Sequence, residues 1–225
     1  MVQYTEWRSI SDGSIISSIP DSGHLHARYD FSEEDGSTPV TDQSGNGRDL
    51  LNGNYSGVGV DINGVQAGLF DGTDDSVWSD TFAETLEQPF TIAWVVELDN
   101  SPNSLNTVVS HSTDATDKHI LHRDDNDEIA LLYGTSDLAG GSQFDMLGSA
   151  LIDGANSILR VEGSQVATGD PGNRDADLHE IGAQGQGNER FFDGKMGEIL
   201  IYEDDRSESF DEIESYLADK WGVSI

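Results

Sequence analysis

The sequence contains no cysteine, and this absence removes three classes of site. A disulfide scaffold, a thiolate metal centre and a cysteine nucleophile all require that side chain. The absence says little about the compartment, because a domain of 225 residues buries enough surface to fold without disulfides. One domain is the natural count for an all-β chain of this length.

Basic residues are scarce. The chain has 11 lysines and arginines against 43 aspartates and glutamates, a formal net charge of -32. No basic patch is present to meet phosphates, so nucleic-acid binding is disfavoured. A folded domain with this charge repels itself at low ionic strength, whereas molar salt shortens the screening length to about 3 Å. The acids are spread along segments with a clear apolar period rather than gathered in a tail, so we expect a halophilic source.

Long apolar runs are also missing. No stretch approaches the roughly 18 apolar residues of a membrane span. Residues 1–14 show no basic region followed by an apolar run, so no secretory signal is expected.

Catalytic motifs are missing as well. No Gly-x-Ser-x-Gly elbow occurs, and no Glu-x-Asp-x-x-Glu strand holds two carboxyl groups about 5 Å apart, as a retaining glycosidase requires. The glycine-rich segment 182–187 lacks the lysine and the following helix of a phosphate loop. We therefore expect a protein that is not an enzyme.

The most informative stretch that is present runs over residues 191–221. It predicts a turn at Asp193-Gly194 and then a strand over 196–202. In that strand Ile199 and Ile201 face one side, while Glu198 and Leu200 face the other.

A closing helix follows this strand. Ser209 is a suitable N-cap, Glu212 stands at the capping-box position, and Gly222 stands where a C-cap belongs. An apolar stripe recurs at helical spacing and comprises Ile213, Tyr216, Leu217 and Trp221. This is the one segment for which the sequence predicts a helix with an N-cap, a C-cap and an apolar stripe. A single helix after many strands indicates a helix that docks on a β-domain.

Two further strands are clear from their period. Over 25–31, the apolar residues Leu25, Ala27, Tyr29 and Phe31 share one face, and His24, His26, Arg28 and Asp30 share the other. The two histidines could form a metal pair, but solvent-facing strand positions are the commoner explanation. The segment 90–98 has apolar residues on both faces, so we expect it to be covered on both sides. Residues 1–22 do not fit the core pattern, and they are either an arm that attaches to a neighbour or an edge strand of the domain formed by 23–225.

Four motifs occur in order and at a familiar spacing. They are HARYDF at 26–31, TDQSGNG at 41–47, GLFDG at 68–72 and PFTIAWV at 89–95, and the segment FFDGKMGEILIYEDD at 191–205 completes the series. From about residue 24 to the end, the chain resembles LamG-like members of the concanavalin A-like jelly-roll superfamily. The resemblance implies an all-β sandwich of two antiparallel sheets with a C-terminal α-helix. It says little about function, because the fold hosts lectins, glycosidases, accessory modules and structural proteins.

The loop over 42–47 is the best metal candidate. Its Asp, Ser and Asn side chains supply oxygens, and its glycines permit tight turns, which suits calcium with its six to eight oxygen ligands. The resemblance implies that Asp42, Asn46 and Asp193 hold a structural calcium ion, while a hydrogen-bonded Asx turn without metal is the alternative. Asp71, Asp74 and Asp75 form either a second cation site or, more in keeping with this composition, an acidic loop tip.

Two non-enzymatic functions remain open. A glycan-binding module would use aromatic and amide side chains near the loops, and the candidates are Asp71, Asp74, Trp78, Asn103 and Gln184. A structural subunit would decorate a larger assembly. The segment LHARYDF after Pro-Asp-Ser resembles LamG-like domains encoded by haloarchaea and their tailed viruses.

We favour a component of a virion surface, such as a spike, turret or fibre head, that contacts host glycans. Such a part is expected to be a symmetric homo-oligomer bound to other virion proteins. The alternatives are a carbohydrate-binding module on the cell surface of a haloarchaeon or outside the cell, and, ranked below it, a glycoside hydrolase.

Overall fold

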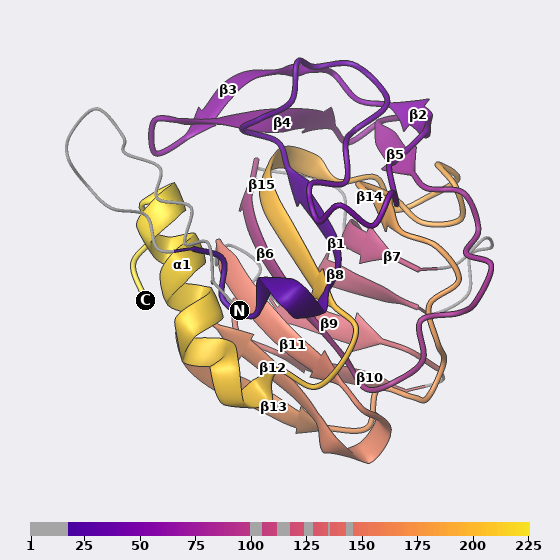
Figure 1. Cartoon of the computed structure of the whole chain (residues 1–225), viewed down its shortest axis with the longest axis vertical. Coiled ribbons are helices and arrows are strands. Elements are labelled where there is room, and N and C mark those ends of the chain that lie inside the picture. The colour runs from indigo at the N-terminus through magenta and orange to yellow at the C-terminus, as the bar shows by residue number, and fades with distance from the viewer. Residues whose placement is uncertain (1–17, 100–104, 112–117, 124–127, 135, 143–145) are drawn as a thin grey trace, which may run out of the picture.

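The computed structural model describes residues 18–99, 105–111, 118–123, 128–134, 136–142 and 146–225. These residues form two antiparallel sheets that face each other, with one α-helix on the outside (Figure 1). The predicted jelly-roll sandwich is therefore confirmed. In the described residues no helix has the length and apolar character to cross a membrane.

The first sheet has eight strands. In spatial order they are β13 (Ser164–Gly169), β12 (Ser157–Val161), β11 (Leu147–Ile152), β6 (Phe90–Leu98), β15 (Asp193–Tyr202), β4 (Val65–Asp71) and β3 (Val58–Ile62), with β1 (Leu25–Asp30) also paired to β15. The long strands β6 and β15 lie at the centre, paired from Gly194↔Leu98 to Tyr202↔Thr91.

The second sheet has seven strands. In spatial order they are β10 (Asp137–Gly140), β9 (Glu128–Leu132), β8 (His119–Arg123), β7 (Leu105–Ser110), β14 (Glu180–Ile181), β5 (Ser76–Trp78) and β2 (Asn52–Asn54). Three short 3₁₀ turns complete the described elements: η1 (Ser22–His24), η2 (Gly154–Asn156) and η3 (Ser207–Ser209).

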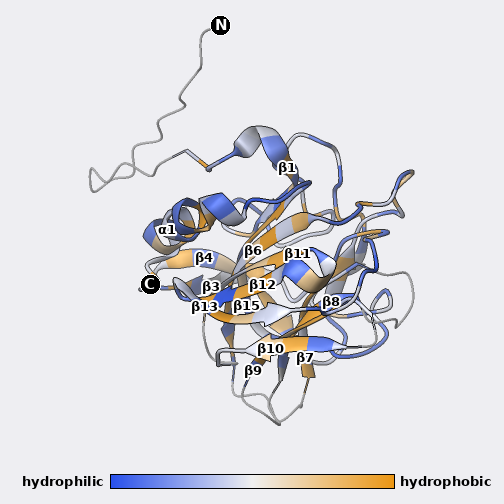
Figure 2. Cartoon of the chain, turned by 90° about the horizontal axis from the view of Figure 1, so that it is seen from below, coloured by the Kyte–Doolittle hydropathy of each residue, from blue (hydrophilic) through white to orange (hydrophobic). Residues whose placement is uncertain are grey.

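The strand period divides the apolar residues into two clusters. In β6, Ile92 and Trp94 face the space between the sheets, and Ala93 and Val95 face the helix α1 (Phe210–Trp221). The prediction that both faces of this strand are covered is confirmed. Figure 2 shows the same division, with hydrophobic residues along the strands and hydrophilic residues over much of α1 and the loops.

The helix α1 lies on the outer face of the eight-stranded sheet, against β6 and β11 (Figure 1). Its predicted N-cap position and the left-handed C-cap at Gly222 (φ 66°) are confirmed. The predicted capping box is wrong, because the Ser209 hydroxyl donates to Asp21 Oδ2 at 2.7 Å and makes no cap bond. Ile213, Leu217 and Trp221 are buried beneath the helix, as the apolar stripe predicts.

A group of buried charges also lies under α1. We call Arg28, Asp30, Glu198 and Lys220 the helix ion cluster. Arg28 Nε donates to Glu198 Oε1 at 2.7 Å, and Lys220 Nζ donates to Glu198 Oε2 at 2.6 Å. Both Arg28 and Lys220 also donate to Asp30 Oδ2. Asp30 and Glu198 are fully buried, so these ion pairs lie inside the protein and not on its surface.

Three local predictions are wrong. No turn occurs at Asp193-Gly194, because β15 begins at Asp193 and pairs there with Asp71. The sequence also predicts a strand over 77–82, but the strand β5 there has only three residues, from Ser76 to Trp78. The third error concerns β1, which has a β-bulge between Leu25 and Ala27. Leu25 and Ala27 are two residues apart, but their partners Tyr202 and Ile201 on β15 are adjacent. Because of this bulge, Leu25 packs in the apolar cluster under α1. His26, which was predicted to face solvent, points inward and is only 5% exposed.

Candidate functional site

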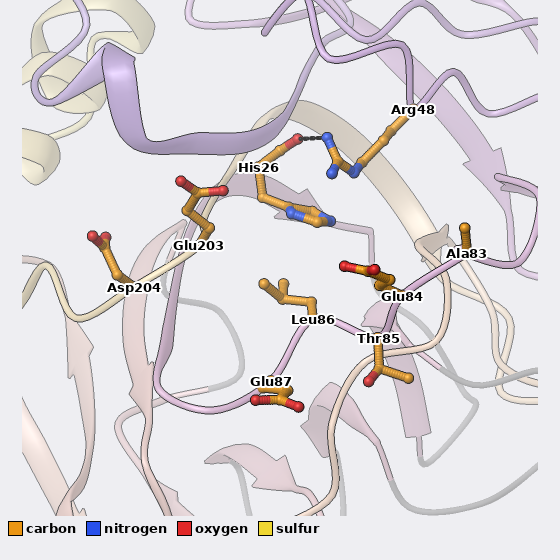
Figure 3. Close-up of a pocket in the computed structure, with 9 residues that line it drawn as sticks. All are labelled: His26, Arg48, Ala83, Glu84, Thr85, Leu86, Glu87, Glu203 and Asp204. Atoms are coloured by element: carbon orange, nitrogen blue, oxygen red, sulfur yellow. Dashed lines mark hydrogen bonds between the residues drawn. The ribbon is translucent and has the colours of Figure 1, made fainter.

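A cleft of about 870 Å³ opens at one edge of the sandwich (Figure 3). Four chain segments line it with His26, Arg48, Ala83, Glu84, Thr85, Leu86, Glu87, Glu203 and Asp204. The volume lies within the range of about 300 to 1,000 Å³ that is usual for small-molecule sites. Most of its lining side chains are charged or polar.

The loop over 42–49 forms the first wall. Asp42 is buried, and its carboxylate accepts backbone N–H bonds from Arg28, Ser44 and Arg48 at 2.9–3.0 Å. The Asp42 N–H in turn donates to Asp49 Oδ1 at 2.8 Å. The loop is thus closed by its own aspartates, as expected of an Asx turn.

This closure aims Arg48 at the cleft. The hydroxyl of buried Tyr29 donates to the Arg48 carbonyl at 2.7 Å, which fixes the backbone. Arg48 Nη1 donates to the His26 carbonyl at 3.0 Å, and the guanidinium lies 5.8 Å from the centre of the Phe82 ring. Of the residues that the structure describes, Arg48 is the one arginine that lines the cleft.

The segment over 79–88 forms the second wall. Its backbone follows the segment over 176–179, with Ser79 N donating to His179 O and Leu86 N donating to Ala176 O, both at 2.9 Å. Leu86 is buried by this pairing, whereas Glu84 and Glu87 stay exposed. The end of β15 supplies the third wall, where Glu203 N donates to the His24 carbonyl at 3.0 Å.

His26 lies at the floor of the cleft. Its imidazole projects toward Arg48 and Glu84 (Figure 3), and its ring centre is 5.2 Å from that of Phe82. Burial lowers the pKa of His26 to about 4, and the Arg48 guanidinium adds to this effect, against a smaller opposite effect of Asp42. The ring is therefore neutral at pH 7. Its Nε2 atom is buried and has no hydrogen-bond partner among the described residues.

Two more buried histidines continue inward from His26. The ring centre of His179 is 5.1 Å from that of His26, and His179 Nδ1 is 3.1 Å from His111 Nδ1. His111 Nδ1 is also 3.1 Å from the Leu178 carbonyl. Burial lowers the pKa of His111 to about 3 and that of His179 well below its usual value. All three rings are neutral at pH 7, so they form an uncharged floor and interior behind the cleft.

The acidic side chains of the cleft differ in how they are paired. Asp204 forms an ion pair with Arg206, whose hydrogen bonds lower the Asp204 pKa. Among the described residues, no ion pair or hydrogen bond engages the side chains of Glu84, Glu87 and Glu203. The cleft therefore presents three uncompensated carboxylates.

The residues predicted to hold calcium do not meet. Asp42 lies beside Arg28, which pairs with Leu200 of β15, whereas Asp193 lies seven residues earlier on that strand. At about 3.3 Å per residue, this separation is roughly 20 Å. The Asn46 amide donates to the carbonyls of Leu25 and His26, at 2.6 and 3.3 Å, and so fastens the loop to β1. The three-residue site is therefore wrong as a set, and calcium binding at Asp42 alone stays a prediction.

The residues predicted to bind glycans do not line the cleft either. Trp78 is half-buried, and an added Cβ on Gly53 or Gly187 would lie 2.6 or 3.3 Å from its Cζ3, so strand β2 and the loop at Gly187 already cover part of the ring. Gln184 is fully buried and bonded to Glu189 and Arg190. Asn103 lies outside the described residues.

The remaining predicted residues, Asp71 and Asp74, lie with Asp75 at the turn after β4. Their oxygens lie within 4.8 Å of one another. Asp71 Oδ1 accepts the N–H of Thr73 and Asp74, as in an Asx turn. Asp75 is buried and bonded to Ser56, and burial raises its pKa. These contacts match the acidic loop tip better than a shared ligand site.

Glu180 is a further unusual acid, and it lies away from the cleft on β14. Burial raises its pKa to about 7, which is the behaviour expected of a general acid. Both of its oxygens are occupied, however, by the backbone N–H groups of Gly187 and Gln186, at 2.6 and 2.9 Å. Because the side chain is fully buried, this arrangement serves to hold the loop over 182–190.

Sequence reasoning missed the cleft. Its lining comes from segments 22 to 116 residues apart, so no motif spacing marks it. One usable signal was present: Glu84 and Glu87 stand in a short polar segment between two strands, where binding residues often occur. No comparable signal revealed the bulge that turns His26 inward.

Comparisons with known proteins agree with this architecture. No family model matches the chain, and no curated protein matches it. Among solved structures it is similar to the sialidase of Trypanosoma rangeli, with a TM-score of 0.63 and 14% identity over 95% of this chain. The same sialidase in complex with sialic acid gives a TM-score of 0.63 at 14% identity, again over 95% of this chain.

A shorter match is domain 4 of the arabinanase AbnA from Geobacillus stearothermophilus, in complex with arabinotriose. Its TM-score is 0.49, at 15% identity over 79% of this chain and 91% of that domain. The chain spans only 35–36% of the sialidase. At 14% identity, the likeness to the sialidase establishes the sandwich fold.

Proposed function

We propose that this protein is a non-catalytic carbohydrate-binding module that holds a glycan in the cleft around His26. The observation that supports this most directly is the open cleft of about 870 Å³, with an unpartnered Nε2 on a histidine that is 5% exposed at its floor. Sugar hydroxyls both donate and accept hydrogen bonds. Carboxylates, a guanidinium and a threonine hydroxyl together offer both kinds of partner.

The sandwich neighbours support the same class of ligand in general terms, since they are a sialidase and a sialidase with bound sialic acid. Apolar contact is also present, because Leu86 and Ala83 line the cleft beside the polar groups. The absence of a glycosidase carboxylate strand from the sequence favours binding without hydrolysis.

A glycan array tests the proposal, probed in molar KCl with the whole chain. We expect binding to a defined set of glycans, and we expect Glu84→Ala combined with Arg48→Met to reduce it at least tenfold. Asp71→Ala is the matched control, because Asp71 is an exposed acid away from the cleft. If the folded protein binds no glycan, or if the cleft variant binds as well as the control, the proposal is wrong.

We further propose that the module is displayed on the surface of a virion of a halophilic archaeal virus, as a homo-oligomeric spike, turret or fibre head. The net charge of -32 supports a saline setting, and the resemblance of the LHARYDF segment supports the viral one. A cell-surface protein of a haloarchaeon is the second candidate. Detection of the chain by mass spectrometry in purified virions would support the first, and its detection only in cell envelopes would support the second.

A further inference from the structure

We infer, on the basis of the proposed function, that the cleft selects uncharged, hydroxyl-rich sugars and excludes sugars that carry a carboxylate or sulfate. The sialidase neighbour binds sialic acid, an anionic sugar. The charges in this cleft indicate the opposite preference.

The count of charges in the lining carries the inference. Glu84, Glu87 and Glu203 have no ion-pair partner among the described residues, and Asp204 is paired with Arg206. Among the described residues, Arg48 is the one cation in the lining, and one of its N–H groups is already bonded to the His26 carbonyl. An anionic sugar would therefore meet three free carboxylates and one guanidinium.

The floor of the cleft does not change this balance. His26 is only 5% exposed and is neutral at pH 7, because burial lowers its pKa. His179 and His111, which continue inward from it, are neutral for the same reason. The neutral His26 ring therefore lies at the floor of the cleft without adding positive charge.

Carboxylates suit hydroxyl-rich ligands, because each ionised carboxylate has two acceptor oxygens that two sugar hydroxyls can donate to. The same groups repel a bound carboxylate, and they do so more strongly where the cleft limits screening by water. The free carboxylates therefore give both attraction for neutral sugars and discrimination against anionic ones.

The test uses neutral oligosaccharide cores, each paired with its own sialylated, uronate or sulfated derivative, on one array at about 0.15 M salt. We expect each bound core to be preferred at least tenfold over its anionic derivative. The triple variant Glu84→Gln/Glu87→Gln/Glu203→Gln keeps hydrogen-bonding groups but removes the charge, and its preference should fall below about threefold.

The matched control is Asp71→Asn/Asp74→Asn/Glu212→Gln, which removes the same charge at exposed positions outside the cleft and should keep the full preference. Equal or tighter binding of the anionic derivatives by the wild type would overturn the inference while leaving glycan binding intact. A loss of preference in the control variant would also overturn it, because net charge would then be the cause. Absence of binding to every core would overturn both this inference and the proposed function.

Discussion

Replacing Glu198 with glutamine removes one charge from the helix ion cluster with almost no change in volume. The carboxylate is fully buried between β15 and α1. It accepts four hydrogen bonds, from Lys220 Nζ at 2.6 Å, Arg28 Nε at 2.7 Å, Tyr216 Oη at 3.1 Å and Trp221 Nε1 at 3.2 Å. Three of these donors belong to α1, so the variant tests whether this cluster holds the helix to the sheet.

The size of the effect follows from charge balance. In the wild type, Asp30 and Glu198 balance Arg28 and Lys220, whose side chains are 13% and 10% exposed. Glutamine leaves two buried cations against one anion, and removal of one partner from a buried ion pair costs about 3 to 5 kcal/mol. In a chain of this size each kcal/mol lowers the melting temperature by about 2 to 4 °C, so we expect a loss of roughly 6 to 20 °C.

Urea unfolding followed by circular dichroism measures this cost, at low salt and in molar KCl. We expect the cost to persist in KCl, because buried pairs are screened far less than surface pairs. Glu212→Gln is the control, since Glu212 is exposed on the same helix, and it should change stability by less than about 0.5 kcal/mol. The double variant Glu198→Gln/Lys220→Met restores the balance and should be more stable than Glu198→Gln alone. A cost below about 1 kcal/mol, or strictly additive effects in the double variant, would refute the reasoning.

Four further results are expected. Burial lowers the folded-state pKa of His26 to about 4, so the contribution of this side chain to stability is present above its unfolded pKa of 6.5 and is lost as the pH falls. His26→Gln should therefore reduce the loss of unfolding free energy between about pH 7 and pH 5 by roughly 2 kcal/mol, as measured by urea unfolding at each pH. Glu180 has the opposite pH dependence, because its folded-state pKa is raised to about 7. Its contribution to stability is present below the unfolded pKa of 4.5 and is lost as the pH rises through 7. Glu180→Gln should therefore remove roughly 2 to 3 kcal/mol of the decrease in unfolding free energy between about pH 5 and pH 8. Gly148→Ala places a Cβ 2.2 Å from Cζ2 of buried Trp94 and should cost about 1 to 3 kcal/mol by thermal melting, against no comparable loss for Gly23→Ala, where no atom lies within 4 Å and the backbone is not left-handed. The melting temperature should rise as KCl increases from tens of millimolar to molar, since salt screens the repulsion of a net charge of -32, and a flat salt profile would contradict this.

The fold was predictable because its main signals are local. Alternation in 196–202 put Ile199 and Leu200 on opposite faces, and the structure has Ile199 between the sheets and Leu200 under the helix. The start and end of α1 followed from one N-cap serine and one C-cap glycine. These patterns depend on the period of a strand or helix, and they need no knowledge of what packs against the segment.

The cleft was not predictable, because it depends on long-range contacts and one irregularity. Arg48 reaches it through the bond from Tyr29 to its carbonyl, and the wall at Glu84 is set by pairing with the segment over 176–179. The bulge before Ala27 then reverses the expected orientation of His26. The buried acids depend on long-range contacts too, because fully buried Glu198 and Glu214 are paired with arginines 170 and 54 residues away in the sequence.

The scarcity of basic residues links the ion pairs in the interior to the negative charge of the cleft. Glu214 is neutralised under α1 by Arg160, through bonds of 2.8 and 2.9 Å, just as Glu198 is neutralised by Arg28 and Lys220. A chain with 11 basic residues that commits several of them to buried carboxylates has few left for its exposed acids. Glu84, Glu87 and Glu203 then stay unpaired as a consequence of composition, without any dedicated motif. Buried carboxylates must be paired to be tolerated, whereas exposed ones need only salt, so this allocation of cations follows from the cost of burial and leaves a negatively charged cleft.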